Sequence, residues 1–113
     1  MKSNVDNPGS VTVNVSAITT QTDVTASRAI DGTVYHNTTG KPIYCMITLQ
    51  LSTPGVGVTL LTDANPAPST VVAFEQNNNA QLILVVLMAI VLPGNYYTLT
   101  SLGNSFTQWI EYS

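Results

Sequence analysis

The feature that most constrains the fold is an unbroken apolar run, LILVVLMAIVL, from Leu82 to Leu92. Polar residues precede it, including Gln81, and Pro93-Gly94-Asn95 follow it. A helix that crosses a bilayer needs about 20 apolar residues. The run has about half of that length, and no cluster of positive charge flanks it. It therefore predicts a buried segment of a folded domain and no membrane insertion.

The composition of the run favours a strand over a helix, because five of its residues are β-branched: Ile83, Val85, Val86, Ile90 and Val91. Alternate residues of a strand point to opposite faces. One face would hold Leu82, Leu84, Val86, Met88, Ile90 and Leu92, and the other Ile83, Val85, Leu87, Ala89 and Val91. One face belongs in a core. The other is buried against another subunit, or is turned inward by a bend near Met88-Ala89. Both alternatives remain open, and the first makes Leu82–Leu92 a candidate subunit-interface strand.

The rest of the chain also has the pattern of short strands separated by Gly, Pro and Asn. Alternation is clearest in residues 43–51, where Ile43, Cys45 and Ile47 alternate with less apolar residues. This pattern predicts an all-β fold: one antiparallel β-sandwich of about eight strands, jelly-roll-like, with no significant helix. The expected strands are 11–18, 33–37, 43–51, 57–62, 70–74, 82–92, 96–101 and 107–112.

The length of 113 residues fits one domain. We expect a β-sandwich domain at 11–113, preceded by a flexible N-terminal arm at 1–10, which is polar and contains Pro8-Gly9. The arm is either a frayed terminus or a segment that becomes ordered on a partner. It lacks the apolar stretch of a secretory signal, which predicts synthesis in the cytoplasm.

Charge is scarce, and this bounds the possible partners. Charged residues are only 8% of the chain, and Lys and Arg together number 3. Binding to nucleic acid requires several cations to neutralise phosphates, so we expect no nucleic-acid partner. A surface so poor in charge solubilises weakly. It is easier to explain if other subunits cover much of it.

Chemistry-bearing residues are few and scattered, which predicts a protein that is not an enzyme. His36 and Cys45 are the single histidine and the single cysteine. A structural zinc site needs four ligands of that type, and no nucleophile or phosphate-loop motif occurs. We therefore expect no catalytic, cofactor-binding or metal-binding residues and no cofactor. The acids occur singly, at Asp6, Asp23, Asp31, Asp63, Glu75 and Glu111.

A set of turn and aromatic residues resembles a recurring module of tailed-bacteriophage virion proteins. The segments are SRAIDGTVYHNTTGKPIYCMITL from Ser27, LPGNYYTL from Leu92, and the terminal FTQWIEYS. The apolar run and Leu92 before Pro93 depart from the module. The residues that match it are Arg28, Gly32, Thr33, Tyr35, Asn37, Thr39, Gly40, Lys41, Pro42, Pro93, Gly94, Tyr97 and Trp109.

The resemblance implies a non-enzymatic β-sandwich located in a virion. The short chain starting at Met1 and the apolar strand favour a head decoration, or cement, protein that stabilises the capsid by oligomeric contacts. Its partners would be like subunits, with a trimer favoured over a dimer, and the major capsid protein or another virion protein. The alternative is a tail-fibre or tail-tip module, whose exposed aromatic residues would bind a host surface glycan or receptor.

Overall fold

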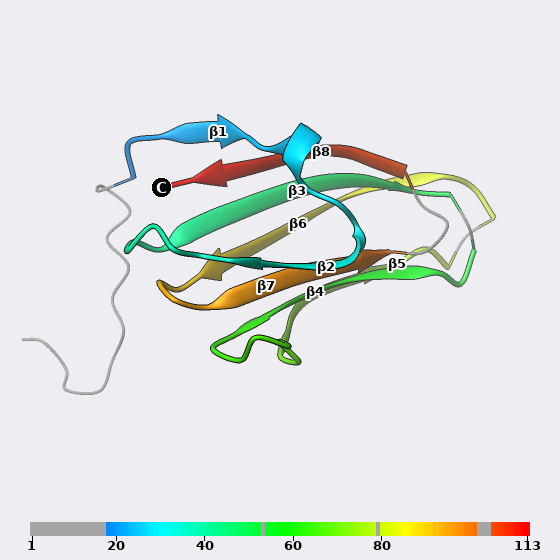
Figure 1. The fold of residues 1–113 in the computed structure, drawn as a ribbon. Coiled ribbons are helices and arrows are strands. Elements are labelled where there is room, and N and C mark those ends of the chain that lie inside the picture. The colour runs from blue at the N-terminus through cyan, green and yellow to red at the C-terminus, as the bar shows by residue number, and fades with distance from the viewer. Residues whose placement is uncertain (1–17, 53, 79, 102–104) are drawn as a thin grey trace, which may run out of the picture.

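The computed structural model describes residues 18–52, 54–78, 80–101 and 105–113. They form two packed four-stranded antiparallel sheets (Figure 1). Sheet A has the order β1-β8-β3-β6 and sheet B the order β2-β7-β4-β5. The elements are β1 (Gln21–Asp23), the short 3-10 helix η2 (Thr25–Ser27), β2 (Asp31–His36), β3 (Ile43–Leu51), β4 (Gly57–Asp63), β5 (Val71–Gln76), β6 (Ile83–Val91), β7 (Tyr96–Ser101) and β8 (Ser105–Tyr112).

The predicted all-β sandwich of antiparallel strands is confirmed. Seven expected strands coincide with β2 to β8, with ends that differ by a few residues. The short strand β1, which pairs with β8, was not predicted. The predicted arm at 1–10 and nearly all of the predicted strand at 11–18 lie outside the described residues. Of the connections between consecutive described strands, only β4–β5 stays within one sheet. The jelly-roll description itself remains a prediction.

The core lies between the two sheets and follows the alternation of the sequence. In β3 every second residue is buried, starting at Ile43, and the residues between them are half-buried. Sheet B contributes Val58 and Leu60 from β4 and Leu99 from β7. Trp109 of β8 and Tyr97 of β7 are the largest side chains in this core.

The chain contains an internal repeat, in which β2-β3-β4 corresponds to β5-β6-β7. Asn37 directly follows the first strand of one unit, and Asn77 directly follows that of the other, 40 positions later. Each amide Nδ2 donates to a carbonyl four residues on and to a carbonyl at the end of a long strand. Backbone N–H groups of Gly94 and Gly55 donate to the carbonyls of Asn37 and Asn77, respectively. Both glycines have positive φ, at 82° and 80°, which suits glycine in the turn that each unit requires.

The strand pairing has approximate twofold symmetry about two central residue pairs. Ile47 faces Leu87 where β3 pairs with β6, and Leu60 faces Leu99 where β4 pairs with β7. The edge strands of sheet B, β2 and β5, are related by the same symmetry. His36 faces Tyr96 in the β2–β7 pair, and Gln76 faces Gly57 in the β5–β4 pair.

The symmetry of the sandwich is broken at the edges of sheet A. Strand β8 pairs with the side of β3 that faces away from β6. The corresponding side of β6 carries no strand in the part of the chain that the structure describes. Strand β6 therefore ends the sheet, next to the edge strand β5 of the other sheet, which it contacts.

Candidate interaction surface

Four residues of the sequence motif meet in one buried cluster, Arg28, Tyr35, Tyr97 and Trp109. The Arg28 guanidinium stands over the Tyr35 ring, 4.6 Å from its centroid. The Tyr35 ring makes an edge contact with Trp109, with the centroids 5.9 Å apart. Arg28 directly follows η2, and the other three residues lie on β2, β7 and β8, so the cluster connects the two sheets.

At the centre of this cluster is Glu111, a residue that the sequence did not single out. Arg28 donates to both carboxylate oxygens, with Nη2–Oε1 3.0 Å and Nε–Oε2 3.2 Å. Oε2 also accepts from the Tyr97 hydroxyl at 2.8 Å and from Trp109 Nε1 at 3.1 Å. Burial, and then the neighbouring carboxylate, raise the pKa of Tyr97. The hydroxyl therefore stays protonated and keeps donating to Glu111.

The polar groups of this cluster hydrogen-bond to one another and link β7 of one sheet with β8 of the other, so the cluster stabilises the contact between the sheets. The carboxylate is nearly covered, with side-chain exposures of 18% for Arg28 and 9% for Glu111. A buried charge pair that satisfies its remaining donors and acceptors specifies one packing arrangement. We assign it a structural role.

Cys45 lies beside this cluster and is fully buried, in agreement with its place among the apolar positions of the alternating segment 43–51. Its Sγ donates weakly to Glu111 Oε2 at 4.0 Å. Burial, followed by the Glu111 charge, raises the pKa of the thiol. Because the thiolate is the reactive form, both access and ionisation oppose reaction.

We therefore expect Cys45 to be inert to thiol reagents in the folded protein. At pH 8, labelling with a chromogenic disulfide should be at least about 100-fold slower than in guanidinium chloride, since the thiolate fraction and access both fall. Absorbance measurements in the two conditions check this. Rapid stoichiometric labelling of the folded protein would contradict the described burial.

A second group of motif residues forms the turn between β2 and β3. Asn37 is fully buried, and its Nδ2 donates to the carbonyls of Lys41, Val91 and Leu92 at 2.8–3.2 Å. Its Oδ1 accepts from the backbone N–H and the hydroxyl of Thr39. The Asn37 side chain thus ties this turn to the end of β6, which explains the Asn-x-Thr-Gly-Lys-Pro spacing structurally.

The other motif residues also occupy turns or local contacts. Gly32, Gly40 and Gly94 have positive φ angles of 91°, 77° and 82°. The Thr33 backbone N–H and hydroxyl donate to the Asp31 carboxylate. Pro42 directly precedes β3, Pro93 lies between β6 and β7, and the Lys41 side chain is exposed. The motif therefore divides into two structural clusters and some turn positions.

Strand β6 presents one face to the core and the other to the surface. Leu87 and Val91 are buried, whereas Val86 and Met88 are about half exposed. The strand pairs with β3 from Ile83 to Val91 without any register shift. The alternative of a bend near Met88-Ala89 is therefore wrong. The exposed side chains, called here the outer row, are Leu82, Leu84, Val86, Met88 and Ile90.

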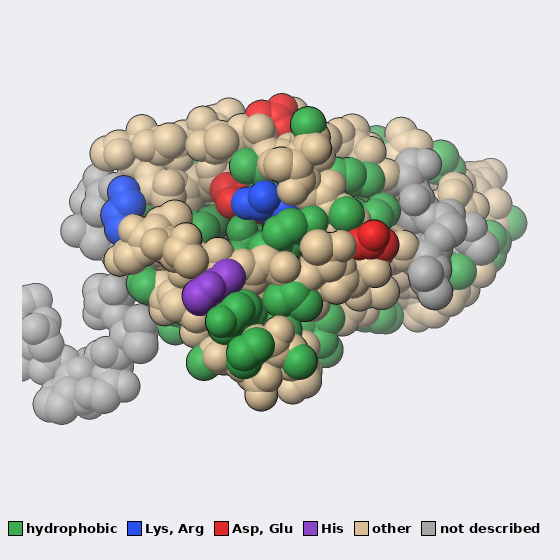
Figure 2. Space-filling model, viewed as in Figure 1, with side chains coloured by type: hydrophobic (Ala, Val, Ile, Leu, Met, Phe, Trp, Pro, Cys, Tyr) green, Lys and Arg blue, Asp and Glu red, His purple; other side chains and the backbone are tan. Residues whose placement is uncertain are grey.

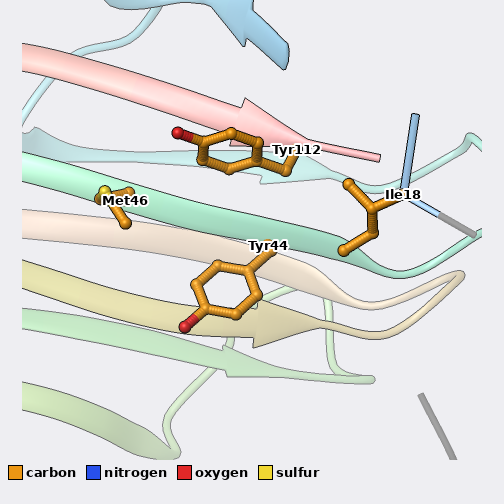
Figure 3. Close-up of a pocket in the computed structure, with 4 residues that line it drawn as sticks. All are labelled: Ile18, Tyr44, Met46 and Tyr112. Carbon is orange, nitrogen blue, oxygen red and sulfur yellow. The ribbon is translucent and has the colours of Figure 1, made fainter. Parts of the chain in front are cut away.

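The outer row continues onto the neighbouring strands of sheet A. Tyr44 faces Ile90, and Met46 faces Met88, across the β3–β6 pair. The Tyr44 hydroxyl lies 3.8 Å from Met88 Sδ. Ile18, Tyr44, Met46 and Tyr112 line an apolar surface pocket of ≈ 230 Å³ (Figure 3). We call the outer row and these four residues the outer face. Thr48 and Gln50 of β3 lie on the same side of sheet A, opposite Val86 and Leu84.

Charged side chains are absent from the two strands that carry most of the outer face. Strands β3 and β6 contain no charged residue. Acidic and basic side chains are visible on the side of the molecule that faces the viewer in Figure 2, where β2 lies in front. A contiguous apolar patch at the surface is typical of an interaction site, so the outer face is the candidate functional surface.

Outside the Glu111 cluster, His36, Asp31 and Asp63 make separate local contacts. His36 Nε2 lies 3.1 Å from the Gly94 carbonyl, and its ring stacks on Tyr96. Asp31 and Asp63 bind nearby backbone N–H groups of their own loops. Among the described residues, no group of three or more His, Cys, Asp or Glu side chains could hold a metal ion.

Comparisons with known proteins give no relative. No protein-family model, curated protein or solved structure matches the chain. In the described part of the chain, no helix is both long and apolar enough to cross a membrane.

Proposed function

We propose that this protein is a non-enzymatic assembly protein, which binds copies of itself and a larger particle through the outer face of sheet A. The observation that carries the proposal is the outer row of β6. Its five large apolar side chains are 41% to 64% exposed. Aromatic and methionine side chains of β3 and β8 extend it, and such side chains are enriched in protein interfaces.

The energetic basis is burial of apolar area. Each Å² removed from water contributes about 25 cal/mol. The outer face carries few charges, so little of that gain is lost to desolvation. Two polar clusters, around Glu111 and Asn37, fix the sandwich and its turns. A rigid surface loses little conformational entropy on binding.

The form of this function that the resemblance supports is a head decoration protein of a tailed bacteriophage. In that role the protein would be located in the virion and clamp neighbouring subunits of the major capsid protein. The resemblance favours a trimer as the unit that binds. A jelly-roll interpretation of the strand order belongs to the same proposal.

The alternative is a tail-fibre or tail-tip module that binds a host glycan or receptor. The observation that favours it is the pocket with Tyr44 and Tyr112 on its rim, whose rings meet edge to face 6.4 Å apart (Figure 3). The copy number in purified virions separates the two. A decoration protein is as abundant as capsid subunits, and a tail module is far rarer.

The first test replaces one residue of the outer row. Met88→Lys should leave the domain folded, because the side chain is half exposed. It should weaken self-association and particle binding by about tenfold or more, the effect of about 1.4 kcal/mol. Sedimentation velocity and co-sedimentation with undecorated capsids measure both effects.

Val34→Lys is the matched control, because Val34 is 41% exposed on β2 of the opposite sheet. This variant should assemble like the parent protein. If Met88→Lys also assembles normally, the outer face is not the binding surface. If only Val34→Lys loses assembly, the surface lies on sheet B.

A further inference from the structure

The edge of β6 that carries no strand among the described residues has a counterpart within the same molecule. The approximate twofold symmetry exchanges β3 with β6. The far side of β3 is occupied by β8, which runs antiparallel to it. By the same symmetry, another antiparallel strand would lie along the far side of β6.

The internal repeat also indicates how many residues of β6 an additional strand would pair with. On β3 the residues that pair with β8 run from Tyr44 to Gln50. Moving 40 positions along the chain gives Leu84 to Ile90 on β6. A strand of similar length would fit there, since β6 is regular and pairs with β3 over its whole length without a register shift.

Strand β6 itself also lacks sequence features that normally prevent strand addition. Edge strands are usually protected by charged side chains, Pro residues or bulges. Between Leu82 and Leu92 there is no charged residue and no Pro. In the β2–β7, β4–β5 and β3–β8 pairs the register shifts at one point, but it does not in the β3–β6 pair. The open edge is thus suited to accept another strand.

We propose that the strand added there is β6 of a second copy of this chain, related by a twofold axis. A twofold axis perpendicular to the sheet makes the two β6 strands antiparallel, as the site requires. It also sets one outer row beside the other, so that apolar side chains pair across the strands, which stabilises a sheet. Such a contact uses both edges and closes on itself, so it does not propagate into a fibre.

This pairing joins the two copies of sheet A into one continuous sheet. It doubles the width of the apolar surface assigned to assembly and so deepens the proposed function, although it does not rest on a virion location. A trimer cannot be built from β6–β6 pairing alone, because a twofold contact leaves no edge for a third copy. The symmetry measured in solution therefore bears directly on the proposal.

The test uses single cysteines on the outer row, Leu84→Cys, Val86→Cys, Met88→Cys and Ile90→Cys. Each variant alone, and each equimolar mixture of two, is treated with a mild oxidant and run on a non-reducing gel. Cys45 is buried and does not compete. In a twofold antiparallel pair, the numbers of any two residues that face each other add up to the same value. We therefore expect fast disulfide formation only between positions whose numbers add up to that value.

Hydrogen exchange measured by NMR gives an independent readout. In an antiparallel edge strand, alternate N–H groups point away from the neighbouring strand. On assembly, those N–H groups of β6 should become protected by at least tenfold. Cross-links without a constant sum, or an assembly that is only trimeric, would overturn the proposal.

The two proposals fail differently. If assembly forms through the outer face while alternate β6 amides still exchange fast, edge pairing is wrong and the proposed function stands. If those amides are protected in the monomer and deletion of residues 1–17 exposes them, the protein's own N-terminal segment covers the edge. That result also overturns pairing with a second copy.

Discussion

Leu87→Asp is expected to unfold the protein, whereas Val86→Asp next to it leaves the domain folded. Leu87 is 2% exposed and lies opposite Ile47 at the centre of the sheet pair, while Val86 is 49% exposed. A carboxylate buried in the core without a partner costs several kcal/mol. Total stability of a domain is only about 5–15 kcal/mol. Circular dichroism and thermal melting measure the difference.

Val86→Asp is the control for the chemistry of the substitution. It introduces the same charge on the same strand but places it in water. We expect a change in the free energy of unfolding of less than about 1 kcal/mol, together with loss of self-association. Equal destabilisation by the two variants would mean that both faces of β6 are packed in one core.

The fold was predictable because alternation of apolar residues has a direct physical meaning in a strand. The pattern in β3 gave its bounds and its buried face. In β6 every residue is apolar, so the pattern could not indicate which face is buried. That choice depends on the register with β3, which places Leu87 opposite Ile47. The three polar residues of β1, Gln21 to Asp23, have no strand pattern, because this strand is exposed and, among the described strands, pairs with β8 alone.

The sequence singled out the motif residues, but it did not indicate that they form structural clusters around Glu111 and Asn37. Residues such as Arg28 and Trp109 are far apart in sequence, and their contact depends on Glu111, which looked like one more isolated acid. Asn77 was also missed, although its spacing to Pro93-Gly94 repeats that of Asn37 to Pro54-Gly55 within one position. A search for internal repeats would have found that signal.

The largest effect outside the apolar core is expected from breaking the Arg28–Glu111 pair. Arg28→Met leaves a nearly covered carboxylate without its cation, and such a loss costs about 3–5 kcal/mol. Glu111→Leu should cost a similar amount. It leaves the guanidinium unpaired and removes the acceptor of the Tyr97 hydroxyl and of Trp109 Nε1. Urea titrations followed by tryptophan fluorescence measure each free energy of unfolding.

The double variant separates pairing from packing. If the two side chains act as a unit, removing both costs less than the sum of the single losses, with a coupling energy of about 2 kcal/mol. Lys41→Met, at an exposed cation, should change stability by less than about 0.5 kcal/mol. Additive losses would mean that Arg28 and Glu111 contribute separately, through the Tyr35 ring contact and the Tyr97 and Trp109 hydrogen bonds. The cluster would then be a packing centre in which the ion pair has no special role.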